Sequence, residues 1–195
     1  MNMKKLLLAG FLVLTALFMI HGEALAKLPR DFQEFKARYQ TEGRSMEGAA
    51  HMYFEAVFSY LDKETRSEAS KMLRYAMYNP APIENSSYFA TFVERLKDES
   101  HHHIFRSFAV GATPENNYRM SPDNFKLDIV SKRKESDFTN LFIRSGGADN
   151  LRGVWMQEHD GLWYMINNAS TYVGVKPPKS AVDAKRNAHD ADYDN

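Results

Sequence analysis

Residues 153–166 read GVWMQEHDGLWYMI, and this stretch decides the fold. Asp160-Gly161 lies between two apolar and aromatic runs, which is a strong signal for a β-hairpin with a two-residue turn. Such a turn pairs His159 with Leu162, and each further pair follows outward as far as Trp155 with Ile166. One face then carries Met156, Trp163 and Met165, and the other carries Trp155, Tyr164 and Ile166. Because both faces are apolar, one packs on helices, and the other is covered by a curved sheet, lines a cavity or forms a binding patch.

Further strands are expected around this hairpin. Alternating or β-rich runs predict strands at 104–110, 125–129, 138–144 and 171–175, besides 153–159 and 162–166. The loops between them are too short for parallel crossovers, so the sheet should be mainly antiparallel.

Helices are expected before the strands. Apolar residues at helical spacing predict helices at 31–40, 45–61 and 63–78, and a fourth that Ser86 or Ser87 caps and that includes Leu96. Asn79-Pro80-Ala81-Pro82 ends the third helix. The predicted class is therefore α+β, with about four N-terminal helices packed on a C-terminal, mainly antiparallel, curved sheet of five to six strands.

The two ends of the chain differ in composition from the middle. Residues 1–26 have a basic start, an apolar run over 6–20 and an Ala24-Leu25-Ala26 site, which is the layout of a cleaved signal peptide. The apolar run is short for a membrane span, so we expect export to a bacterial periplasm or exterior, with no transmembrane segment after cleavage. We expect a single domain over 27–178 and a disordered polar tail over 179–195.

Composition excludes several classes of function. The chain has no cysteine and a formal net charge of zero, so it has no disulfide, no thiol nucleophile and no basic excess for nucleic acid. His101-His102-His103 lacks a recognisable further ligand, and we favour a helix end over a metal site there. We expect no metal and no cofactor, because no nucleophile, phosphate-loop or zinc motif is present.

Two loop segments, at 107–118 and 144–149, look more particular than ordinary loops, and a third motif follows at 172–178. Residues 107–118 read SFAVGATPENNY, residues 144–149 read RSGGAD, and residues 172–178 read YVGVKPP. These motifs resemble an uncharacterised family of secreted bacterial domains of unknown function. The resemblance covers roughly 46–178 and implies a secreted single domain, but it transfers no catalytic residue. A weaker resemblance in fold is to NTF2-like proteins, in which helices cover a curved sheet around a pocket.

These observations favour an exported, non-enzymatic module that binds a small molecule or an envelope or extracellular protein. The candidate ligand-binding residues are Thr113, Glu115, Asn116, Asn117, Tyr118, Arg144, Asp149, Trp155, Trp163 and Tyr164. Two alternatives stay open. One is a hydrolase or isomerase with an NTF2-like cavity, using His51, Glu115 or Asp149 as a base; the other is a structural envelope protein whose tail links it to partners.

Overall fold

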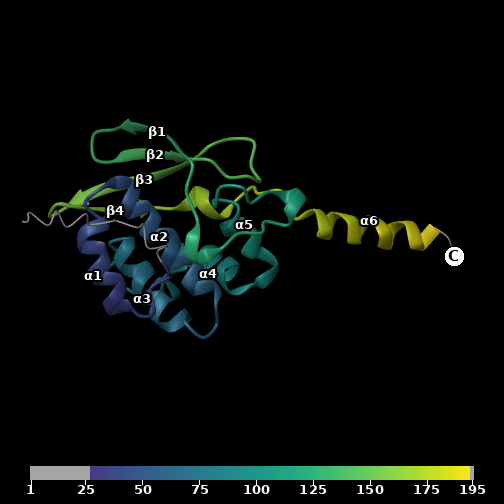
Figure 1. The fold of residues 1–195 in the computed structure, drawn as a ribbon, viewed down its shortest axis with the longest axis horizontal. Helices are drawn as coiled ribbons and strands as arrows, with labels where there is room; N and C mark the ends of the chain where they lie inside the picture. The colour runs from purple at the N-terminus through teal and green to yellow at the C-terminus, as the bar shows by residue number, and fades with distance from the viewer. Residues whose placement is uncertain (1–26, 194–195) are drawn as a thin grey trace, which may run out of the picture.

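The computed structural model describes residues 27–193, and the predicted signal peptide lies outside them. Within this range the fold is α+β, with six α-helices and one four-stranded antiparallel sheet (Figure 1). The elements are α1 (Phe32–Glu42), α2 (Met46–Leu61), α3 (Arg66–Ala76), α4 (Ala90–Lys97), α5 (His102–Arg106), β1 (Ile129–Lys134), β2 (Thr139–Ile143), β3 (Arg152–His159), β4 (Leu162–Asn167) and α6 (Lys179–Tyr193). Short 3₁₀ turns connect several of them. The strands follow one another as a simple meander, β1-β2-β3-β4.

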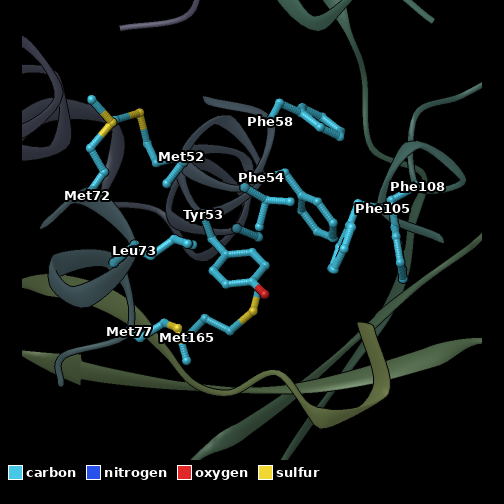
Figure 2. Packing of buried hydrophobic residues seen from close by; sticks show 14 of the residues in the cluster. Met52, Tyr53, Phe54, Phe58, Met72, Leu73, Met77, Phe105, Phe108 and Met165 are labelled. Atoms are coloured by element: carbon cyan, nitrogen blue, oxygen red, sulfur yellow. The ribbon is translucent and has the colours of Figure 1, made fainter. Parts of the chain in front are cut away.

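Helix α2 is the centre of the core. Ser45 caps it by accepting a hydrogen bond from the Gly48 N–H at 3.0 Å, as its sequence position predicts. Most of its residues are buried, because α1, α3, α4, α5 and β4 pack around it. Figure 2 shows its side chains reaching in different directions, with Tyr53 pointing toward Met165 on β4.

The hairpin has the predicted pairing at four positions and differs at the fifth. His159 pairs with Leu162, and the register holds as far as Met156 with Met165. A β-bulge then places Trp155 opposite Asn167 instead of Ile166. A bulge inserts one unpaired residue, and the alternation of side chains in the sequence does not predict it.

The two faces of the hairpin have different surroundings. Met156 and Met165 are fully buried toward the helices. On the opposite face Trp155 is 41% exposed and stacks on Phe138, with ring centroids 4.4 Å apart. Tyr164 lies on that same face by register, yet it is only 6% exposed. The second apolar face is thus open at one end and covered at the other.

The end of α1 supplies that cover, because it closes the free edge of β4. The Trp163 N–H donates to the Gly43 carbonyl at 2.7 Å, and the Tyr39 hydroxyl donates to the Trp163 carbonyl at 2.8 Å. The Tyr39 ring also stacks on Tyr164 with centroids 5.5 Å apart. A covered edge cannot pair with another chain, so α1 protects β4 from edge-to-edge association.

Three predicted strands are wrong in whole or in part. Residues 104–110 form most of α5 and a following turn, since Ile104, Phe105 and Phe108 are buried at helical rather than alternating spacing. Residues 125–129 are mostly loop, with one isolated bridge from Leu127 to Ala109 before β1 begins. Residues 171–175 begin inside the 3₁₀ turn Ala169–Tyr172, continue without regular structure and include Gly174 at a φ of +58°. The described sheet therefore has four strands rather than five or six.

Residues 179–193, which the sequence analysis expects to be disordered, form helix α6. This helix extends away from the rest of the domain (Figure 1). At its start the Ser180 N–H donates to the Asn117 side-chain oxygen at 2.8 Å, so a side chain from a distant loop caps the helix. No helix within residues 27–193 is long and apolar enough to span a membrane.

Candidate ligand groove

A groove of about 810 Å³ lies where α1, the end of α3 and β4 meet. Its lining residues are Phe32, Lys71, Arg74, Tyr75, Tyr78, Asn79, Pro80 and Tyr164. Aromatic rings dominate this set, and two cationic side chains accompany them. The volume falls within the range of about 300–1,000 Å³ that is typical of small-molecule sites.

The rings of the groove hold one another in place. Tyr75 meets Phe32 edge-on, with ring centroids 5.9 Å apart, and it meets Tyr164 edge-on at the same centroid distance. Tyr78 lies tilted against Tyr164 at 4.9 Å and stacks on the His159 ring at 4.0 Å with nearly parallel planes. Edge-on and stacked pairs are the favourable arrangements of aromatic side chains, so the walls are preorganised.

Tyr78 adopts a backbone conformation that is unusual for its residue type. It has a φ of +51° and follows Met77, the C-cap of α3. The Asn79 N–H bonds to the Arg74 carbonyl at 3.0 Å, and the Tyr78 N–H bonds to the Tyr75 carbonyl at 3.0 Å. This is a Schellman motif, in which the left-handed position is usually glycine. A tyrosine there costs about 1–2 kcal/mol, and the result is an exposed ring at the rim of the groove.

The Tyr164 hydroxyl stays protonated in this setting. Burial raises the pKa of Tyr164 above its usual value, and the interaction with Tyr75 raises it further. The residue therefore offers a neutral phenol, which can donate or accept a hydrogen bond at the floor of the groove.

The three motif segments meet elsewhere in the fold, at a site that we call the motif junction (residues 107–118, 144–149 and 172–178). The hydroxyls of Ser107 and Ser145 lie 2.7 Å apart, and the Gly146 N–H donates to the Ser107 carbonyl at 2.8 Å. The Tyr118 hydroxyl donates to the Lys176 carbonyl at 2.6 Å. These bonds join the segments into one packed unit at the point where the chain leaves the domain.

Most of the predicted loop residues use their polar atoms within this junction. Thr113 and Asn116 form a capping box, in which the Thr113 N–H donates to Asn116 Oδ1 at 3.0 Å. Asn117 caps α6, and burial raises the pKa of Tyr118 to about 12. A bond from its own backbone N–H and one from the Thr113 side chain hold the pKa of the exposed Glu115 carboxyl below its usual value.

Of the remaining predicted residues, Arg144 and Asp149 belong to the 144–149 segment of the junction, and the two tryptophans lie outside it. Arg144 donates to Asp128 at 2.8 Å, and Asp149 accepts from Lys176 at 2.6 Å, both at the surface. Trp155 lies on the open face of the sheet, and Trp163 is half-buried beside the edge contact of β4. Of the ten predicted residues, Tyr164 alone is among the groove's lining residues. The structure therefore does not bring the predicted set together as one site.

The sequence analysis missed the other groove residues because it assigned 63–78 by its core-facing side. Tyr75 lies beside the core-facing residues of α3 and is partly buried, and Tyr78 follows the end of the helix, directly before the Asn79-Pro80 stop. Two tyrosines three residues apart at a helix end are a usable signal, although only the fold shows that β4 completes the wall.

The histidines considered for chemistry have other partners than the sequence spacing suggests. His51 lies 3.4 Å from the buried Glu55 rather than beside Glu47, and Arg38 donates to the same Glu55 oxygen at 2.6 Å. Burial opposes charge on His51, but the hydrogen bond and charge of Glu55, with smaller contributions, raise its pKa overall. In the histidine run, His102 contacts the Leu96 carbonyl at 3.1 Å, and His103 contacts the Ser100 carbonyl at 2.7 Å.

A family model described as "Domain of unknown function (DUF6935)" matches residues 27–179. The chain belongs to this family. The matched range includes α1 to α5, the whole sheet and the motif junction, and it ends where α6 begins. No curated protein and no solved structure matches the chain significantly.

Proposed function

We propose that this DUF6935 protein is an exported, non-enzymatic binding module that holds a small ring-bearing molecule in the groove between α1, α3 and β4. Export rests on the sequence of residues 1–26. Binding rests on one observation above all, which is that Tyr78 occupies a position where glycine would relieve backbone strain. Strained residues cluster at functional sites, and Tyr78 differs from the equally strained Tyr118 because its ring is exposed, whereas Tyr118 is buried and its hydroxyl bonds within the domain.

The groove also has the composition of a small-molecule site. Phe32, Tyr75, Tyr78 and Tyr164 offer ring faces and edges, and Asn79 and the tyrosine hydroxyls offer polar contacts that can orient a ligand. The bases considered for a hydrolase or isomerase, His51, Glu115 and Asp149, are not among the lining residues. Binding is therefore the function that this geometry supports best.

The test is a binding screen on the protein from residue 27 onward. Ring-bearing fragments (phenols, indoles, nicotinates and pyranosides, with neutral and anionic members) are titrated while backbone amide NMR shifts are followed. We expect hits whose shifts centre on Tyr75, Tyr78 and Tyr164. Tyr78→Ala should weaken these hits about tenfold or more, because stacking on one aromatic ring is worth about 0.5–1.5 kcal/mol beyond its buried area.

The matched control is Tyr88→Ala. Tyr88 is also an exposed tyrosine, at 64%, but it lies in the turn before α4 and does not line the groove. It should leave every hit unchanged. Absence of any hit in the groove at millimolar concentration, or equal binding by the Tyr78→Ala protein, overturns the proposal.

A further inference from the structure

The charged residues that line the groove are all cationic. Lys71 and Arg74 are among its lining residues, whereas no aspartate or glutamate is. Lys71 forms a salt bridge with Glu68, one turn away on α3. Arg74 has no carboxylate within salt-bridge distance among the side chains described, residues 27–189. One unbalanced positive charge therefore stands beside the aromatic wall.

Two backbone carbonyls fix the direction of the Arg74 side chain. Its Nε donates to the Asn79 carbonyl at 3.3 Å, and its Nη2 donates to the Pro80 carbonyl at 2.6 Å. A guanidinium has five N–H donors, so several remain for a ligand. The fixed planar group suits the two oxygens of a carboxylate or phosphate, and little side-chain entropy is lost when it binds.

The same backbone motif positions both groups. The Schellman turn sets the ring of Tyr78 and presents the carbonyls of Asn79 and Pro80 that hold Arg74. The Tyr78 ring and the Arg74 guanidinium thus lie close together at the end of α3. Their proximity suits a ligand that carries a ring and a negative group close together.

We infer that the ligand of the groove is a small molecule with a ring that bears a carboxylate or phosphate, and that Arg74 binds this oxyanion while Tyr78 contacts the ring. The inference rests on the proposed function and names its ligand class. Lys71 contributes less than Arg74, because Glu68 already neutralises it.

The test uses matched probes that differ in the oxyanion. One pair is 4-nitrophenyl β-D-glucuronide and 4-nitrophenyl β-D-glucoside, which tests the carboxylate; the other is phenyl phosphate and phenol, which tests the phosphate. We expect at least one anionic probe to bind about tenfold more tightly than its neutral partner, since bonds between charged groups are the stronger ones. This preference should shrink when sodium chloride rises from 50 to 500 mM, an increase that shortens the screening length to about 4 Å.

Variants test whether Arg74 causes the preference for the anionic probe. Arg74→Gln should abolish this preference, and Lys71→Gln should reduce it less. Arg119→Gln, at an exposed arginine in the loop after the motif residue Tyr118, should leave it intact. Thermal melts establish that each variant is folded, and the wild-type comparison of probe pairs does not depend on any variant.

The outcomes separate this inference from the proposed function. If neutral and anionic probes bind the groove equally and Tyr78→Ala weakens both, the binding function stands and the oxyanion inference is overturned. A preference that survives in Arg74→Gln overturns the role of Arg74. If no probe and no fragment binds the groove, both proposals fail.

Discussion

Replacing Tyr78 by glycine should give a more stable protein than replacing it by alanine. Both variants lose the same ring contacts with His159 and Tyr164, so their comparison isolates the backbone. At the φ of +51° a residue with a Cβ costs about 1–2 kcal/mol, and glycine avoids this cost. Glycine in turn loses about 0.5–1 kcal/mol more conformational entropy on folding. The glycine variant should thus be more stable by about 0.5–1 kcal/mol.

Position 71 provides the matched comparison. Lys71 is an exposed residue inside α3, and both substitutions remove its salt bridge with Glu68 equally. There alanine should be more stable than glycine by about 1 kcal/mol, the usual order in a helix interior. Alanine should thus be the more stable variant at position 71 and glycine at position 78. The two alanine–glycine differences in the free energy of unfolding have opposite signs, and their magnitudes add up to about 1.5–2 kcal/mol.

The assay is urea unfolding followed by circular dichroism, with the four variants measured in parallel. For a domain of this size, 1 kcal/mol corresponds to about 2–4 °C in melting temperature, so thermal melts offer a second measure. Alanine being the better residue at both positions would refute the strained conformation of Tyr78, and with it the main support for the groove as a site. Both variants at position 78 should lose ligand binding to the same extent.

Three further predictions concern the rest of the domain. Gly146→Ala should lower the free energy of unfolding by about 1–3 kcal/mol in urea titration, because its Cβ would overlap the Ala112 carbonyl oxygen in the motif junction. His51 has a raised pKa in the folded protein, so its stabilisation is complete below the unfolded value of about 6.5 and declines as pH rises through the folded value. The stability difference between the wild type and His51→Gln should decrease from pH 5.5 to pH 8.5, and a constant difference would contradict the pairing with Glu55. Deleting residues 179–195 should change the melting temperature by less than about 2 °C, since α6 packs on little besides the loop that caps it.

Local chemistry explains which parts of the fold the sequence predicts. Helices α1 to α4 follow from apolar spacing, α2 also from its cap Ser45, and the hairpin follows from Asp160-Gly161. The predicted cap of α4 is wrong, because Ser87 begins a 3₁₀ turn directly after Ser86, and α4 begins at Ala90 without a side-chain cap. These are interactions between residues close in the chain. The strand predicted at 104–110 is wrong because a short apolar run has no decisive period, and tertiary packing of Phe105 and Phe108 selects a helix and turn.

The site is harder to predict than the fold because distant segments build it. The place of Tyr164 on the second face of the hairpin predicts a role in binding, and the residue lines the groove. Its neighbours Tyr75 and Tyr78 lie at and just after the end of a helix nearly ninety residues earlier. The packing of α2 against both α3 and β4, together with the edge contact of α1 with β4, brings these segments together, and no local pattern encodes those contacts.

The most distinctive sequence motifs and the proposed binding groove lie in different parts of this protein. The motif junction contains the most recognisable residues, yet their hydroxyl, amide and carbonyl groups are paired with one another, as Asn116 is with the Thr113 N–H and with the Gly111 carbonyl. Groups that satisfy each other have little capacity left for a ligand, so the junction serves to lock the loops and to set the start of α6. The groove differs in having an exposed ring and a cation without a carboxylate partner among the described residues. Backbone strain does not separate the two places, because Asn117 and Tyr118 of the junction have positive φ angles as Tyr78 does. What separates them is that the polar groups of the junction are satisfied and those of the groove are available, so the end of α3, and not the motif junction, is the place to test first for binding.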